Sequence, residues 1–221
     1  MVVLFFHYLM KYSVRFLLFF SKKLNCFQLK NELYFAYGAN LGIERYMEND
    51  IPFIDKGSAF KEGYEINFTL PCRYLDMGFA NIQEKKGHYA WGRLYQVSKL
   101  GITFLDIIER VPFGYYSREE MVFKNEKGES LKAWCYVACF PQKNLTPPSF
   151  YLNYMREKSA IFNFPKDYRD YLESTKSREY FDIDYGFCFS NPKKRRPFVK
   201  QLLLFYKAHD FLREFIIKYL P

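Results

Sequence analysis

The residues best suited to binding an anion lie at positions 34–41, which read Tyr-Phe-Ala-Tyr-Gly-Ala-Asn-Leu. The first four are aromatic or apolar and predict a buried strand that ends at Gly38. Glycine and asparagine tolerate positive φ angles, so Gly38 and Asn40 favour a turn at this point. Unpaired amides in such a turn form a concave nest, and a ligand can approach a glycine closely because it has no side chain. The run predicts either a site for a carboxylate or an oxyanion, or a plain structural turn.

Glu109 is the carboxylate whose position most favours chemistry, because it falls at the end of a predicted helix. Ser98 is a suitable N-cap, and apolar residues recur after it at helical spacing as far as Ile108. A glutamate in the last turn lies near the negative end of the helix dipole, which disfavours its charged form and suits a general base. The residues alone leave open a solvated glutamate at a helix end.

Three segments, in the same order, resemble motifs of the γ-glutamylcyclotransferase family. Residues 34–41 are similar to its opening Tyr-Phe-Ala-Tyr-Gly-Ser-Asn-Leu motif, with Ala39 where serine is usual. Leu-Asp-Ile-Ile-Glu at 105–109, followed by Gly-Tyr-Tyr at 114–116, resembles its Leu-Asp-x-x-Glu-Gly segment and the Gly-x-Tyr after it. Arg110 stands where the glycine of that segment is usual.

The third segment, Pro-Ser-Phe-Tyr at 148–151 and running on to Phe-Pro-Lys-Asp-Tyr at 164–168, resembles the family's Pro-Ser-x-x-Tyr helix, which ends near Leu-Pro-x-x-Tyr. The resemblance implies an α+β fold, a small mixed β-barrel flanked by helices. The expected organisation is a basic apolar leader at 1–30, one γ-glutamylcyclotransferase-like domain at 31–175 and a basic helical extension at 176–221.

The resemblance implies an enzyme that converts γ-glutamyl amino acids or peptides into 5-oxoproline and the free amino acid, with no cofactor and no metal. The substrate's α-amine would attack its own γ-carbonyl, with the matched Glu109 as general base. Arg110 would either help to bind a carboxylate or favour the charged form of Glu109. Backbone amides of residues 34–39 would hold the substrate carboxylate or the developing oxyanion. The expected substrate-binding residues are Tyr34, Phe35, Ala36, Tyr37, Gly38, Ala39, Asn40, Tyr116 and Tyr151.

Alternating apolar residues and turn signals predict the other strands of the barrel. They are a strand at 53–69, a hairpin with arms at 80–82 and 89–97 around a turn at 85–87, and a hairpin with arms at 115–123 and 133–140 joined by a turn at 125–128. Asn40 is expected to cap a short helix at 41–49, and Ser149 to cap a helix at 150–162, with one more short helix at 164–172.

Composition excludes several classes of protein. The 49% hydrophobic content is ample for a core, which argues against disorder. The five cysteines are odd in number and contain no Cys-x-x-Cys pair, which argues against a disulfide scaffold or zinc ribbon and favours a reducing, cytosolic compartment. The three histidines lie far apart, so neither a metalloenzyme nor a histidine-based triad is expected.

The net charge of +9 comes from the two ends of the chain. Residues 1–30 contain five basic residues and no acidic one, and residues 176–221 contain ten basic and five acidic residues. The central part has a net charge of −1, so no nucleic-acid partner is expected. Lys11 and Arg15 interrupt the apolar leader and argue against a transmembrane helix.

Several alternatives stay open at this point. The leader could direct the chain to an organelle or pack as a helix, and the two basic ends could together bind an anionic membrane peripherally. The oligomeric state is not indicated. The alternative functions are a related cyclotransferase for γ-glutamylamines or glutathione, and a catalytically weak protein that docks a partner or membrane through its basic ends.

Overall fold

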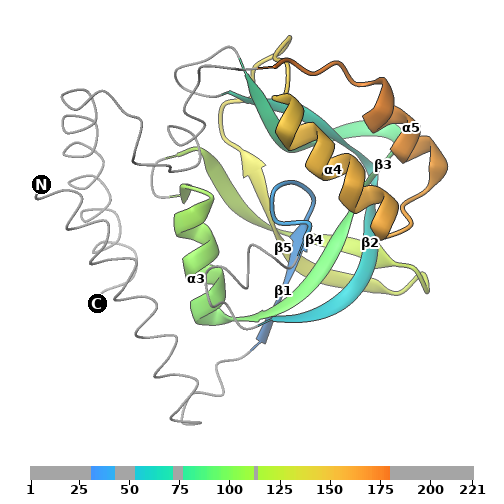
Figure 1. The fold of residues 1–221 in the computed structure, drawn as a ribbon. Helices are drawn as coiled ribbons and strands as arrows, with labels where there is room; N and C mark the ends of the chain where they lie inside the picture. The colour runs from blue at the N-terminus through green and yellow to red at the C-terminus, as the bar shows by residue number, and fades with distance from the viewer. Residues whose placement is uncertain (1–30, 43–52, 72–76, 112–113, 180–221) are drawn as a thin grey trace, which may run out of the picture.

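Strands β1 to β5 close into a barrel in the computed structural model, which describes residues 31–42, 53–71, 77–111 and 114–179 (Figure 1). The order around the barrel is β1-β3-β2-β4-β5. Neighbouring strands are antiparallel except β1 and β5, which meet in parallel at Tyr34 and Trp134. The α+β fold expected from the sequence, a small mixed barrel with flanking helices, is confirmed.

The described elements are, in chain order, β1 (Asn31–Ala36), β2 (Phe53–Pro71), β3 (Gly78–Ser98), α3 (Lys99–Ile108), β4 (Tyr116–Asn125), β5 (Ser130–Ala138), α4 (Ser149–Ile161) and α5 (Lys166–Ser174). The β4–β5 hairpin, with its turn after Asn125, and the helix that starts after Pro165 agree with the sequence-based expectations. The leader at 1–30, most of the helix expected at 41–49 and residues 180–221 lie outside the described part of the chain.

The long strand β3 corrects one prediction. Residues 80–82 and 89–97 were expected to pair with each other, but both pair with β2, so no hairpin turn lies at 85–87. Residues 85–88 instead leave the register of the β2–β3 ladder. Gly63 on β2 and Gly87 on β3 adopt φ angles of +78° and +80° at this irregularity, a conformation that glycine tolerates without a steric penalty. The Lys-Lys-Gly signal therefore marks a bulge within a strand.

Aromatic side chains fill the barrel. The rings of Phe35 and Phe123 stack with centroids 4.0 Å apart, and the ring of Tyr34 meets that of Tyr136 edge to face at 5.5 Å. Such ring pairs contribute about 0.5–1.5 kcal/mol beyond the apolar area that they bury. A Cβ atom on Gly92 would overlap the ring of Phe35, so β3 can approach β1 this closely only with glycine at that position.

Helix α3 begins and ends with recognisable capping interactions. The Oγ atom of Ser98 accepts a hydrogen bond of 3.0 Å from the amide of Gly101, as expected of an N-cap. At the other end the amide of Glu109 donates to the carbonyl of Leu105 at 2.8 Å, so Glu109, directly after Ile108, closes the last turn of the helix. Arg110 follows with a φ angle of +57°, the left-handed conformation in which glycine commonly ends a helix.

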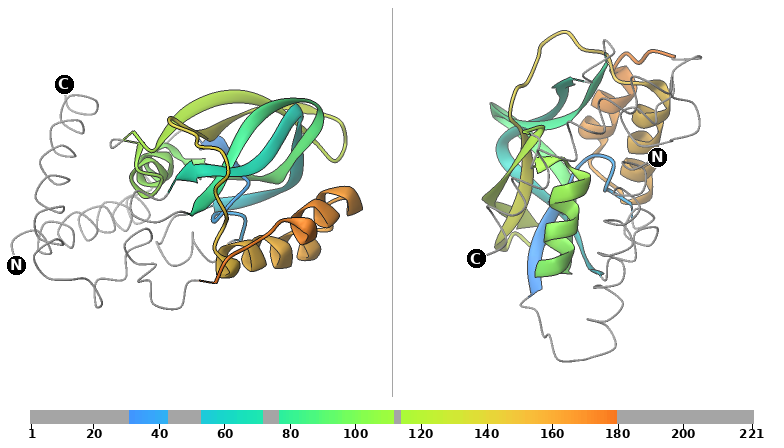
Figure 2. Two further views of the ribbon diagram at one scale, coloured as in Figure 1. Left: turned by 90° about the horizontal axis from the view of Figure 1, so that it is seen from above. Right: turned by 90° about the vertical axis from the view of Figure 1, so that its left-hand side faces the viewer.

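Helices α4 and α5 lie side by side against one side of the barrel, whereas α3 packs against β1 and β3 (Figure 2). Arg156 of α4 joins the two helices, because its guanidinium donates to the carbonyls of Leu172, Glu173 and Thr175 at the end of α5. The expected N-cap role of Ser149 is wrong: Pro148 occupies that position, and the hydroxyl of Ser149 bonds to Ser177. None of the described helices is long and apolar enough to cross a bilayer.

Candidate active site

Asn40 and Glu109 are in direct contact, although 69 positions separate them in the sequence. The Nδ2 atom of Asn40 donates to Oε1 of Glu109 at 2.6 Å and to the hydroxyl of Tyr34 at 3.0 Å. Asn40 is only 3% exposed, and Glu109 is half-buried. The Asn40 side chain therefore holds the carboxylate instead of capping the expected helix. The turn and the glutamate identified separately in the sequence form one site.

The turn after β1 is fixed by hydroxyl groups from two other elements. The amide of Leu41 donates to the carbonyl of Gly38 at 3.0 Å and closes a β-turn. Tyr95 of β3 donates its hydroxyl to the carbonyl of Leu41 at 2.6 Å, and Tyr154 of α4 accepts from the amide of Gly42 at 2.9 Å. These bonds hold the segment that carries Asn40 in place.

Gly38 is needed because of a close contact and not because of its φ angle. Its φ lies outside the left-handed region, so the tolerance of glycine for positive φ is not what the turn uses here. A Cβ atom at this position would instead lie 2.6 Å from the hydroxyl oxygen of Tyr151. The same hydroxyl accepts from the amide of Ala80 at 3.3 Å, and Tyr116 donates to the Ala80 carbonyl at 2.5 Å. The backbone of Ala80 thus holds both predicted tyrosines beside the turn.

The tyrosines near Glu109 stay neutral at physiological pH. Burial raises the pKa of Tyr34, Tyr37, Tyr116 and Tyr136 well above the usual value of 10.0. The negative charge of Glu109 raises the pKa of each of them further, because a second anion nearby would be repelled. These side chains are therefore neutral hydrogen-bonding groups and not charges.

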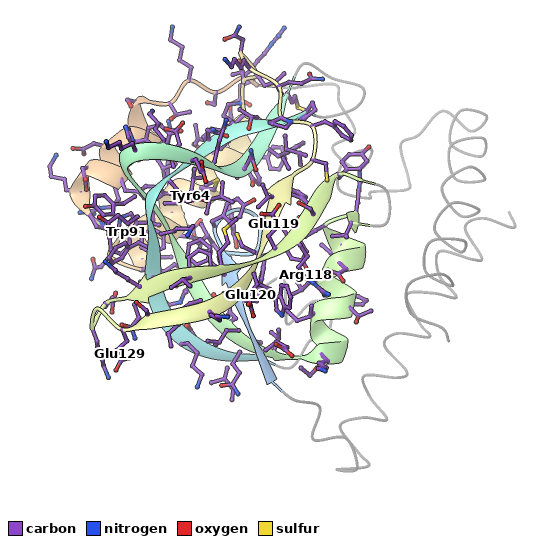
Figure 3. The ribbon with its side chains drawn as sticks, turned by 180° about the vertical axis from the view of Figure 1, so that it is seen from behind. Tyr64, Trp91, Arg118, Glu119, Glu120 and Glu129 are labelled. Carbon is purple, nitrogen blue, oxygen red and sulfur yellow. The ribbon has the colours of Figure 1, made fainter. Side chains whose placement is uncertain are left out.

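Asp106 fixes the helix that carries Glu109. Its carboxylate is 1% exposed and accepts hydrogen bonds from the Tyr136 hydroxyl at 3.0 Å and from Nη1 of Arg118 at 2.8 Å. Arg118 extends from β4 on the side next to α3 (Figure 3), and its guanidinium also lies 4.8 Å from the ring centroid of Trp134. This network ties the C-terminal half of α3 to the β4–β5 hairpin.

The remaining predicted site residues divide into two groups. Phe35 and Ala36 are fully buried, and residues 34–36 lie in the part of β1 that pairs with β3. Tyr37 is also buried and donates its hydroxyl to the carbonyl of Tyr136 at 2.6 Å. By contrast, the backbone amides of Ala39 and Asn40 make no hydrogen bond within the described residues. These two amides are candidates for the anion nest expected from the sequence.

Sequence reasoning missed Tyr95, Tyr136 and Tyr154. Tyr154 follows Tyr151 by three residues on α4, and residues at that spacing share a helix face, so the pattern could have indicated it. Tyr95 and Tyr136 lie in strands rich in aromatic residues. No sequence signal separates a site tyrosine from a core tyrosine in such strands.

The described residues offer few alternatives to this site. An open hollow of about 360 Å³ lies elsewhere on the barrel, and its lining includes Tyr64 and Glu119 but not Glu109 (Figure 3). No group of three or more histidine, cysteine, aspartate or glutamate side chains that could hold a metal ion occurs among the described residues.

The arrangement around Glu109 suits proton transfer next to a developing anion. A positioned carboxylate can take a proton from a bound amine, and the two turn amides can donate hydrogen bonds to an oxyanion. Burial raises the pKa of the nearby Cys135, which is therefore a thiol and a poor nucleophile at neutral pH. The geometry favours general base catalysis over the formation of a covalent intermediate.

Known proteins resemble this chain in sequence and in fold. The AIG2-like family matches residues 89–172, which contain Glu109, Tyr116 and Tyr151. Gamma-glutamylcyclotransferases of Bos taurus and Mus musculus are 24% identical over 152 residues and 26% identical over 154 residues, and each match spans 67% of this chain and 80% of the relative. A solved structure of a gamma-glutamyl cyclotransferase superimposes with a TM-score of 0.63 at 20% identity, over 79% of this chain and 98% of its own.

Proposed function

Because this chain belongs to the γ-glutamylcyclotransferase family, of the AIG2-like type, we propose that it converts γ-glutamyl amino acids or peptides into 5-oxoproline and the free amino acid. The contact between Asn40 and Glu109 carries the proposal, since it joins the opening turn and the glutamate of the two most specific motifs. A site that holds one carboxylate next to free turn amides has the groups that this reaction requires.

The reaction needs a base because the α-amino group of the substrate is protonated at neutral pH. Glu109 removes a proton from that group, and the amine then attacks the γ-carbonyl carbon of the same molecule. The new C–N bond closes the five-membered ring, and the tetrahedral intermediate collapses as the original γ-amide C–N bond breaks. Glu109 returns the proton to the departing nitrogen. The ring nitrogen loses its second proton as the lactam forms, and the released amino group takes up this second proton, so the amino acid leaves in its ammonium form.

The remaining acceleration comes from positioning and from the turn. Nucleophile and electrophile belong to one molecule, so holding the folded conformer replaces a costly encounter. The amides of Ala39 and Asn40 donate to the oxyanion that forms on the γ-carbonyl oxygen. Because these donors belong to the backbone, they are retained with alanine at position 39, where the family usually has serine.

Arg110 sets a further expectation for the substrate. Arg110 directly follows Glu109 in the sequence. Its guanidinium lies 5.0 Å from the ring centroid of Tyr115. A cation on the residue directly after the base favours a ligand with a second anionic group, such as the carboxylate of a released amino acid. A γ-glutamyl amino acid has that group, whereas a γ-glutamylamine does not.

The test is an assay of the purified full chain with γ-glutamyl-alanine, glutathione and a γ-glutamylamine as parallel substrates. The expected result is equal amounts of 5-oxoproline and alanine from γ-glutamyl-alanine. Turnover of glutathione or the γ-glutamylamine alone would assign the chain to the related cyclotransferases. Absence of 5-oxoproline from all three substrates would contradict the proposal and leave a binding role.

A further inference from the structure

Asn40 uses only half of its hydrogen-bonding capacity in this structure. Its Nδ2 atom donates to both Glu109 and Tyr34, whereas its Oδ1 atom is buried and accepts no hydrogen bond. A side-chain amide has an acceptor oxygen as well as its donor nitrogen, and leaving a buried acceptor unsatisfied costs about 1–3 kcal/mol. A buried asparagine with an empty acceptor beside a candidate base points to a ligand that supplies the missing donor.

The orientation of this amide follows from the chemistry of its partner. An ionised carboxylate only accepts hydrogen bonds, so the amide nitrogen has to face Glu109. The amide oxygen then points to the other side of the same planar group. Both atoms are bonded to the same carbon, so Oδ1 stays next to the Asn40–Glu109 hydrogen bond.

We propose that Asn40 binds the α-amino group of the substrate, with Oδ1 accepting one N–H while the carboxylate of Glu109 accepts another. This inference rests on the proposed cyclotransferase function and gives the nucleophilic amine a specific binding position. An ammonium group has three N–H donors and no acceptor, which matches an orphaned amide oxygen next to an acceptor-only carboxylate. After Glu109 removes one proton, the bond to Asn40 keeps the amine from rotating, and its new lone pair is available for the γ-carbonyl.

The proposal makes a prediction about ligands that differ by one group. Glutaryl-alanine is γ-glutamyl-alanine without the α-amine, and it keeps the carboxylates and the γ-amide. If Asn40 binds the amine, removal of its side-chain amide weakens the binding of γ-glutamyl-alanine and leaves the binding of glutaryl-alanine unchanged. If Asn40 only supports the turn, the binding of both ligands is weakened equally.

The experiment is isothermal titration of both ligands to two variants, Glu109→Gln and the double variant Glu109→Gln/Asn40→Ala. Glutamine at 109 prevents turnover and retains an oxygen that accepts from Asn40, so the titrations report binding alone. The expected result is an approximately tenfold weaker affinity of the double variant for γ-glutamyl-alanine, as for a lost hydrogen bond to a charged group. Affinity for glutaryl-alanine should stay within about twofold.

A second variant keeps the inference falsifiable if alanine at 40 disturbs the fold. Asn40→Asp in the Glu109→Gln background retains an acceptor oxygen and should bind γ-glutamyl-alanine at least as tightly as Glu109→Gln alone. Equal losses for both ligands, or loss of γ-glutamyl-alanine binding in the aspartate variant, would overturn the assignment of Asn40. If the wild-type protein forms no 5-oxoproline and neither ligand binds to Glu109→Gln, the proposed function fails, and the assignment of Asn40 fails with it.

Discussion

A Cβ atom at residue 38 would lie 2.6 Å from the hydroxyl oxygen of Tyr151, so the turn after β1 and the first turn of α4 fit together only while residue 38 is glycine. The next neighbour of that Cβ would be the side chain of Ala80 at 3.2 Å. The Tyr151 hydroxyl is itself fixed, because it accepts from the amide of Ala80. The contact couples the candidate site directly to the helix packing.

We expect Gly38→Ala to lower the free energy of unfolding by about 1–3 kcal/mol, the usual cost of overpacking a buried position. Tyr151→Phe removes the clashing oxygen, so the double variant Gly38→Ala/Tyr151→Phe should lose less than the sum of the two single variants. Urea unfolding of all four proteins measures this coupling. Additive losses would show that the two residues do not compete for the same space.

Glu109→Gln should reduce turnover of γ-glutamyl-alanine by at least a hundredfold, because the amide cannot accept the proton of the amine. Its stability should change little, since the glutamine oxygen still accepts from Nδ2 of Asn40. Glu119→Gln is a matched control, because Glu119 is an exposed carboxylate on β4 that lines the separate hollow. Retention of a third of the wild-type rate in Glu109→Gln would exclude the role of general base.

At residue 110 we expect glycine to give a more stable protein than alanine, which is the reverse of the usual order. At most helix and strand positions a protein with glycine is less stable than one with alanine by roughly 0.5–1 kcal/mol. At residue 110 the φ angle of +57° places any side chain in the left-handed region. We therefore expect Arg110→Gly to be more stable than Arg110→Ala by about 1 kcal/mol. Both variants lose the contact with the Tyr115 ring, so their difference in thermal unfolding isolates the backbone conformation; an alanine variant as stable as the glycine variant would contradict this prediction.

The buried tyrosines should make the fold sensitive to alkaline pH. Burial raises the pKa of Tyr171 from 10.0 to about 12 and raises the pKa of Tyr34, Tyr37, Tyr116, Tyr136 and Tyr168 as well. Because the unfolded chain releases these protons first, their contribution to stability is complete below pH 10 and falls as the pH rises above it. Each such tyrosine contributes a slope of about 1.4 kcal/mol per pH unit. Urea unfolding between pH 8 and about 11 should show a constant free energy followed by a steep decline.

Tyr168→Phe is the control for this pH dependence. The Tyr168 hydroxyl is buried and has no hydrogen-bond partner among the described residues, so its removal breaks no bond. The variant should match or exceed the wild-type stability at pH 7. Above pH 10 its free energy of unfolding should fall less steeply with pH, because about one proton fewer is released on unfolding. An unchanged slope would show that Tyr168 ionises alike in the folded and unfolded chains.

Local signals in the sequence predicted much of the fold and the two halves of the site. The capping serine at 98, the hairpin turn after Asn125 and the helix start at Pro165 depend on neighbouring residues only, and these predictions were correct. The bulge at 85–88 was mistaken for a turn because Lys-Lys-Gly has the same local preference in both. Which one forms is decided by pairing with β2, a contact that the local sequence does not contain.

The details of the site were less accessible for the same reason. The importance of Gly38 was recognised, but its cause, the Tyr151 hydroxyl, lies 113 positions away. The orientation of the Asn40 amide depends on its hydrogen bond to Glu109, which lies at the end of another element, α3. Residues 34–36, whose amides the resemblance assigned to substrate, pair with β3 in the barrel, so the local motif does not show which of these amides stay free. Long-range packing determines which groups of a motif stay free.

The closure of the barrel through β1 and β5 also has a consequence for biosynthesis. Tyr34 pairs with Trp134, so the first strand can find this neighbour only after about a hundred further residues have left the ribosome. Contacts of such high sequence separation form slowly, since the entropy of a long loop has to be lost before the contact is made. Until then one edge of β1 lacks its partner. Variants that weaken the β1–β5 junction should therefore reduce the soluble yield during synthesis even where the finished protein is stable.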